Sequence, residues 1–244
     1  MANRPRSQPR RRDTYSYYTK RPLNCLVFIA PLLLFFHIGA ARYGTELLAP
    51  VVVRDFLGYL GAPAAYLSPL LIAGVLLAQQ AGRREKWKVQ PIALVGMAAE
   101  SLAYAGPLVA LSYLTGQIAS AAAETAPADR AILPQLLRAV GAGIYEEFLF
   151  RMVLLGLAML LLVDVLELKQ DLVAICAVVL GALAFSAVHF AFLGLGGQQA
   201  FRWSTFVFLT LAGIYWGILY LARGFGIAVG SHIVWDAFVL LSGS

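Results

Sequence analysis

Three short clusters of ionisable residues interrupt the apolar C-terminal half of the chain. The clusters are Glu146-Glu147-Phe148-Leu149-Phe150-Arg151, Phe185-Ser186-Ala187-Val188-His189 and His232-Ile233-Val234-Trp235-Asp236. Carboxylates and imidazoles are the groups that move protons in hydrolysis. An ionisable side chain at membrane depth costs about 2.5–3.5 kcal/mol on insertion scales and usually faces a cavity. Three clusters in successive apolar segments therefore indicate one shared polar site better than three independent burials.

The spacing within two of the clusters is helical. Glu147 and Arg151 are four residues apart, so they share a helix face and could form a neutralising ion pair. Glu146 points about 100° away from Glu147, which leaves it without a local cation and makes it a candidate general base. His232 and Asp236 are also four residues apart, and Asp236 could orient His232 through a hydrogen bond.

The composition shows what kind of protein must position these residues. The 244 residues are 60% hydrophobic and 13% charged, with a mean hydropathy of +0.75, whereas soluble domains are nearer 45–50% apolar and 25% charged. We therefore predict an all-α, polytopic membrane helix bundle with about seven transmembrane helices (six to eight). A cytosolic enzyme and a disordered chain are excluded. Two ionisable residues, His37 and Glu100, lack companions at helical spacing and are interpreted as hydrogen-bonded packing residues.

The apolar runs predict where the helices lie. The predicted spans cover about 23–41, 64–81, 91–115, 143–163, 171–193, 203–221 and 226–241. Residues 42–63 suit an interfacial or re-entrant segment, 116–131 a loop and 132–142 an amphipathic lead-in, with Gly141 and Gly143 allowing a break or bend. The predicted organisation is a mobile basic cytoplasmic tail at 1–22, N-terminal transmembrane helices at 23–129 and a C-terminal core at 130–244.

The positive charge is concentrated beside the apolar spans. The net charge is +6, and 11 of the 19 Lys and Arg residues lie within 1–21 and 83–88. Short basic segments next to hydrophobic spans are typical of cytoplasmic flanks, so the N-terminus is predicted to be cytoplasmic. No folded domain with a basic face is indicated, so the predicted partner is the lipid bilayer and not nucleic acid.

The ordered set of clusters suggests a family. Glu146-Glu147-x-x-x-Arg151, Phe185-x-x-x-His189 and His232-x-x-x-Asp236 together resemble the signature of the CAAX protease and bacteriocin-processing family, also called CPBP or Abi. The resemblance covers about residues 130–241. This family includes the type II CAAX prenyl endopeptidases and many bacterial intramembrane proteases. The resemblance implies a glutamic-type intramembrane endopeptidase without a metal cofactor, in the inner membrane of a prokaryotic cell, acting on a membrane-anchored or lipidated protein.

The resemblance also implies a role for each matching residue. Glu146 and His189 would hold and activate the attacking water, and His232 and Asp236 would stabilise the oxyanion. The implied supporting residues are Glu147, Arg151 and Phe185. One position departs from the family, which often has Asn where this chain has Asp236. An ionised carboxylate cannot donate a hydrogen bond, so Asp236 is either protonated or only orients a protonated His232.

Two other functions remain open at this stage. Glu146, His189 and His232 have the ligand types of a catalytic His₂Glu zinc site, although no His-Glu-x-x-His pair is present. A non-catalytic transporter or chaperone-like membrane protein could also use intramembrane carboxylates and histidines as a relay. A transporter would be expected to show duplicated hydropathy halves, and none is visible in the sequence.

Overall fold

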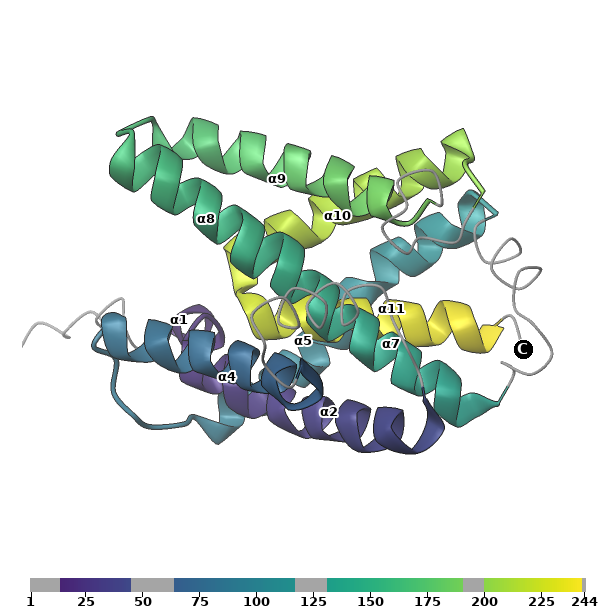
Figure 1. The fold of residues 1–244 in the computed structure, drawn as a ribbon, viewed down its shortest axis with the longest axis horizontal. Helices are drawn as coiled ribbons and strands as arrows, with labels where there is room; N and C mark the ends of the chain where they lie inside the picture. Colours follow the sequence, from purple (N-terminus) through teal and green to yellow (C-terminus); the bar gives the residue numbers. More distant parts are fainter. Residues whose placement is uncertain (1–13, 45–63, 117–130, 191–199, 243–244) are drawn as a thin grey trace, which may run out of the picture.

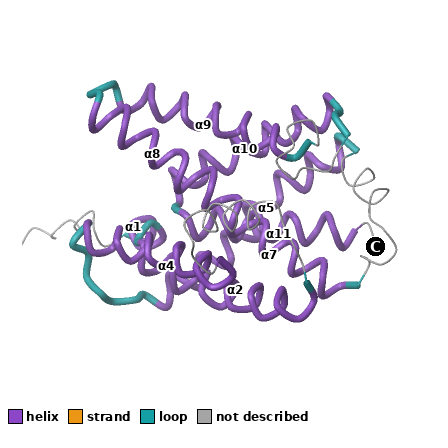
Figure 2. Tube along the Cα trace, in the orientation of Figure 1, coloured by secondary structure: helices purple, strands orange, loops and turns teal. Residues whose placement is uncertain are grey.

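The computed structural model describes residues 14–44, 64–116, 131–190 and 200–242, and all structural statements concern these ranges. Every regular element in them is a helix (Figures 1 and 2). The elements are α1 (Tyr15–Thr19), α2 (Pro22–Tyr43), α4 (Ala64–Gly82), α5 (Pro91–Leu114), α7 (Ile132–Glu147), η3 (Phe148–Leu155), α8 (Gly156–Ala158), η4 (Met159–Val165), α9 (Gln170–Val188), α10 (Trp203–Arg223) and α11 (Phe225–Ser242).

The helices are long and apolar enough for a multi-pass membrane protein. Six candidate spans occur in the described ranges, namely α2, α5, the continuous helix Ile132–Val165, α9, α10 and α11. The apolar part of α4, Leu67–Gly82, is shorter. Each predicted span corresponds to one of these helices. The prediction of an all-α, polytopic bundle is therefore confirmed, and the chain is an integral membrane protein.

Local sequence explains several helix ends. Proline occupies the first turn of α2 and of α5, where its missing N–H leaves no hydrogen bond unmade. Gly44 ends α2 in the left-handed conformation with φ of +64°. Gly224 joins α10 to α11 with φ of +95°, a conformation that other residues rarely adopt.

Two predicted boundaries are wrong. Gly141 and Gly143 were expected to allow a break or a bend, and a break is absent there, because the helix runs without interruption from Ile132 to Val165 and contains the π-helical segments η3 and η4. The fifth predicted span was expected to reach 193, but α9 ends at Val188 and His189 forms its C-cap. The expected interfacial segment and the loop after α5 lie largely outside the described residues, at 45–63 and 117–130.

The predicted mobile tail is folded over its last part. Tyr15–Thr19 forms α1, and Arg21 is only 4% exposed. The Arg21 guanidinium donates hydrogen bonds to the carbonyl oxygens of Lys86 and Lys88 in the basic loop after α4. The start of α2 is therefore fastened to the end of α4, and the expectation of mobility is wrong for residues 14–21. Residues 1–13 lie outside the described ranges.

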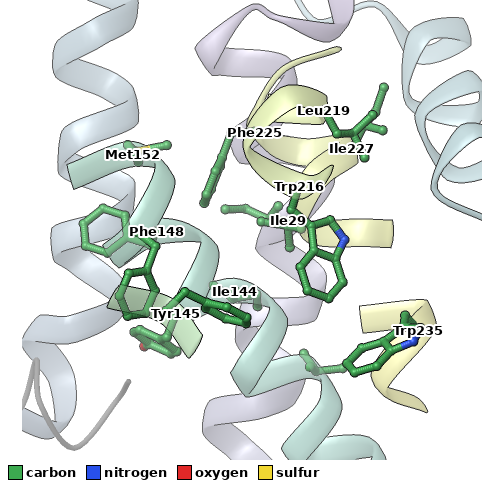
Figure 3. Close-up of a cluster of buried hydrophobic side chains, with 14 of the residues drawn as sticks. Ile29, Ile144, Tyr145, Phe148, Met152, Trp216, Leu219, Phe225, Ile227 and Trp235 are labelled. Carbon is green, nitrogen blue, oxygen red and sulfur yellow. The ribbon is translucent and has the colours of Figure 1, made fainter. Parts of the chain in front are cut away.

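Close packing joins the helices that carry or flank the three polar clusters. A Cβ atom on Gly213 would lie 2.9 Å from Ala182 Cα, so α10 and α9 approach closely. A Cβ atom on Gly143 would lie 3.0 Å from the backbone nitrogen of Ile233, so α7 and α11 do the same. Small residues permit such approach between membrane helices. The buried aromatic and aliphatic side chains between α2, α7, η3, α10 and α11 fill the centre (Figure 3).

Candidate active site

The fold brings the three polar clusters together at the centre of the bundle. Glu146 and Glu147 end α7, Arg151 lies in η3, and α9 contributes Phe185 and the C-cap His189. His232 and Asp236 lie on α11. The most deeply buried ionisable side chains of the site are Glu147 at 0%, His232 at 1%, Arg151 at 3% and Glu146 at 8% exposure. All seven residues singled out in the sequence therefore share one site.

Glu147 holds two of the clusters together. Its Oε1 atom lies 3.1 Å from Arg151 Nη1, which is the ion pair predicted from the four-residue spacing. The same oxygen accepts a hydrogen bond of 2.8 Å from His232 Nδ1, 85 residues away. Arg151 Nη2 in turn donates to the carbonyl oxygen of Gly213 at 3.2 Å. Glu147 therefore fixes both a cation and an imidazole.

Each carboxylate oxygen of Glu146 faces a different imidazole. Oε1 lies 3.8 Å from His189 Nε2, and Oε2 lies 3.7 Å from His232 Nε2. Asp236 Oδ2 lies 3.6 Å from the same His232 nitrogen. These distances exceed those of direct hydrogen bonds, about 2.7–3.2 Å. Catalytic hydrogen bonds are often long before substrate arrives. The side chains of Glu146, His189, His232 and Asp236 point toward one another here without forming direct hydrogen bonds through these atoms.

The hydrogen bond made by the Nδ1 atom of each histidine indicates that this nitrogen carries a proton. His189 Nδ1 donates to the carbonyl oxygen of Phe185 at 2.7 Å, which leaves Nε2 as an acceptor in the neutral ring. His232 Nδ1 donates to Glu147, while its Nε2 faces Glu146 and Asp236. Ionised carboxylates only accept hydrogen bonds, so both ring nitrogens of His232 face acceptors. The two imidazoles therefore differ in the groups that surround their Nε2 atoms.

Two aromatic rings line the polar site. Trp216 of α10 stacks on His232 with centroids 3.8 Å apart and ring planes at 13°, an arrangement that favours an imidazolium. The Arg151 guanidinium carbon lies 4.7 Å from the centre of the Phe185 ring. Sequence reasoning identified Phe185 but missed Trp216, whose only local signal is a glycine on either side, Gly213 and Gly217.

His37 and Glu100 lie in hydrogen-bonded contacts with other helices. His37 Nε2 hydrogen-bonds the Tyr145 hydroxyl at 2.5 Å, and Tyr145 also donates to Ser68. Glu100 accepts two hydrogen bonds from Arg223, one of them from Nε at 2.9 Å. Both side chains are hydrogen-bonded, and their partners lie on other helices.

The donor types of a His₂Glu zinc site are present in Glu146, His189 and His232. Within the described ranges, however, no group of three His, Cys, Asp or Glu side chains has the spacing of a metal site. Zinc binding would require bonds of about 2.0–2.2 Å from nitrogen and oxygen ligands. A metal at this site therefore stays an alternative to be tested with a chelator.

The contact at Gly143 sets the distance between the glutamates and His232. In the Gly143→Ala variant the new methyl group meets the backbone of Ile233, so we expect a loss of about 1–3 kcal/mol of stability from overpacking. The separation of α7 and α11 should also reduce activity. Thermal unfolding in detergent checks this expectation. Gly106→Ala is the matched control, because no atom lies within 4 Å of its new Cβ. Equal stability of the two variants contradicts the expectation.

Comparison with known proteins identifies a family over the part of the chain that contains the site. The family model described as Type II CAAX prenyl endopeptidase Rce1-like matches residues 129–238. The matched segment includes all seven site residues. No curated protein and no solved structure matches the chain.

Proposed function

Because residues 129–238 belong to the Rce1-like family of type II CAAX prenyl endopeptidases, we propose that this membrane endopeptidase is of the glutamic type. Its proposed substrate is a membrane-anchored or lipidated protein, in which it hydrolyses a peptide bond. The observation that carries the mechanism is the position of Glu146, whose two oxygens face the Nε2 atoms of His189 and His232. A carboxylate between two imidazoles can both accept and deliver protons.

Glu146 and His189 activate the attacking water. Both groups accept hydrogen bonds, since Glu146 is a carboxylate and the Nε2 atom of neutral His189 carries a lone pair. A water bound between them loses one proton to this pair as its oxygen attacks the carbonyl carbon of the peptide. The proton then passes to the leaving nitrogen when the C–N bond breaks, so the products are a carboxylic acid and an amine.

His232 stabilises the negative charge that develops on the carbonyl oxygen. Its protonated Nε2 is a charged donor held in place by Glu147 and by the Trp216 ring. A donor fixed before the reaction stabilises an oxyanion without reorganisation, and removal of one such donor typically costs about 10²–10³ in rate. Asp236, 3.6 Å from His232 Nε2, is assigned the role of orienting this imidazolium.

A cleavage assay in proteoliposomes tests the proposed function. The substrates are fluorogenic peptides of one sequence, presented as a prenylated peptide, an acylated peptide and a transmembrane-anchored peptide, with the unanchored peptide as the control. Cleavage of at least one anchored form and not of the free peptide is the expected result. Absence of cleavage of every anchored form by a folded protein would overturn the proposal.

The proposed orientation places the basic end of the bundle in the cytoplasm. Arg21 at the start of α2 contacts the loop after α4, and Gly224 between α10 and α11 packs against Thr19 and Lys20. Figure 1 draws the end of α11 on the opposite side from α1. His189 caps the end of α9 that lies away from the 166–169 turn, so we expect the site to open toward the non-cytoplasmic side.

Reporter fusions check this orientation. We expect alkaline phosphatase fused after Ser244 to be active and a cytoplasm-only fluorescent reporter at the same position to be dark, because positive charge near span ends sets orientation. The same two reporters inserted after Leu168 should give the reverse pattern. Fluorescence at the C-terminus contradicts the orientation and the access side together.

A further inference from the structure

A cavity separate from the polar site opens at the basic end of the bundle. It has a volume of about 310 Å³ and lies between α2, α4, the α8 region and the turn from α10 to α11. This volume is at the lower end of the range for ligand pockets, about 300–1,000 Å³. The apolar side chains that line it include Pro22, Leu76, Met152, Leu155, Met159 and Phe225. None of the seven site residues lines it.

Two cationic side chains line this cavity, and no acidic side chain is among its lining residues. The cations are Lys20 and Arg83, both exposed. Arg83 Nη1 donates to the carbonyl oxygen of Lys20 at 3.4 Å, which joins the two positions. Gly224 packs so closely that a Cβ there would lie 2.8 Å from the Thr19 carbonyl oxygen and 2.9 Å from Lys20 Cα. The backbone that carries Lys20 is therefore held in place.

The nearest acidic residue in the basic loop is already engaged. Glu85 is the one carboxylate within 83–88. It accepts a hydrogen bond from the Tyr17 hydroxyl and lies 4.0 Å from Arg21 Nε. Glu85 is therefore directed at other partners, and the positive charge of Lys20 and Arg83 stays available to an anion.

We propose that this cavity binds one anionic phospholipid from the leaflet at the basic end. The phosphate lies between the Lys20 ammonium and the Arg83 guanidinium, and one acyl chain enters the apolar cavity between the helices. Basic pockets between transmembrane helices are suited to acidic headgroups. A free phosphate would satisfy the cations but leave the apolar lining unfilled, and a zwitterionic lipid would fill the cavity but bring a third cation beside Lys20 and Arg83.

The first test measures lipid selectivity. Native mass spectrometry of the full chain in micelles containing equal amounts of phosphatidylglycerol and phosphatidylcholine should show one phosphatidylglycerol retained preferentially. With about 1 kcal/mol for each cation near a lipid surface, the Lys20→Gln/Arg83→Gln double variant should lose about 30-fold of this preference. The control, Lys86→Gln/Lys88→Gln, removes the same charge from the same end of the protein but leaves the cavity residues intact, and it should retain the preference.

The second test fills the cavity. Gly156 lines it, and no atom lies within 4 Å of a Cβ placed on this residue, so the Leu side chain of Gly156→Leu starts in open space and is expected to occupy the cavity. Gly74→Leu is the matched control, since Gly74 on α4 also has no atom within 4 Å and does not line the cavity. Gly156→Leu should lose the retained phosphatidylglycerol, whereas Gly74→Leu should keep it. Thermal unfolding of both variants shows that they are folded.

The outcomes separate the lipid from a free anion. Added glycerophosphoglycerol, the soluble headgroup without acyl chains, should not displace the retained lipid at equimolar concentration. Displacement by this headgroup overturns the proposal in favour of a simple anion site. Equal retention of the two lipids by the wild-type protein, or undiminished phosphatidylglycerol retention by folded Gly156→Leu, overturns it as well.

Discussion

Replacement of Glu146 by glutamine is expected to lower the rate of peptide cleavage by about 10²–10⁴-fold, the contribution typical of a general base. Glutamine keeps the size of the side chain and its contacts with the two imidazoles, but it cannot take a proton from water. The amide should leave the fold intact, because the Glu146 oxygens lie 3.7–3.8 Å from their partners, whereas Glu147 contacts Arg151 and His232 at 3.1 and 2.8 Å. The loss should therefore appear in the chemical step.

Initial rates in proteoliposomes measure this effect, with the melting temperature as the folding control. His189→Ala and His232→Ala should also lose cleavage, because one shares the activation of water and the other supplies the oxyanion donor. Asp164→Asn is the matched control: it removes a carboxylate from the far end of the same continuous helix, where Asp164 is exposed. Cleavage at the wild-type rate by Glu146→Gln is incompatible with the glutamic mechanism.

Glu147→Ala and Arg151→Ala are expected to destabilise the protein by about 3–5 kcal/mol each, because each leaves a buried charge without its partner. Glu147→Ala removes the acceptor of both Arg151 and His232, so it should also lower activity. Arg151→Ala leaves the hydrogen bond between Glu147 and His232 in place. It should therefore act mainly through stability.

Unfolding free energies from denaturant titration in mixed micelles measure these losses. The double variant Glu147→Met/Arg151→Met removes both charges and fills their volume, so it should be destabilised by less than the sum of the single variants. The difference between the double variant and the sum of the single variants gives the part of the free-energy loss that comes from burying a charge without its partner. Single variants with the wild-type free energy of unfolding would mean that the ion pair between Glu147 and Arg151 does not stabilise the fold.

The sequence predicted the site better than it predicted the surrounding contacts. Helical spacing is a local property, so the pairs Glu147–Arg151 and His232–Asp236 could be inferred from four-residue steps. The free-energy cost of burying ionisable side chains in a membrane then indicated that the three clusters share one site. The hydrogen bond from His232 to Glu147 and the stacking of Trp216 on His232 join different helices. Such contacts depend on how the helices pack, and no local pattern encodes them.

The errors in the predicted fold have the same origin. Gly143 was interpreted as allowing a break or bend, whereas it permits the close approach of α7 to α11, because a glycine can serve either purpose and only the partner helix distinguishes them. Residues 14–21 are polar and basic, which is typical of a mobile tail, yet Arg21 finds carbonyl acceptors in the loop after α4.

The central claim is that Glu146 and His189 activate water and His232 supplies the oxyanion donor, without a metal ion. The most direct test is the cleavage rate of the reconstituted wild-type protein after exhaustive treatment with a zinc chelator, with and without zinc added back. The account predicts an unchanged rate after chelation and no gain on addition of zinc. Loss of cleavage on chelation, with recovery on addition of zinc, would contradict it and assign Glu146, His189 and His232 as metal ligands.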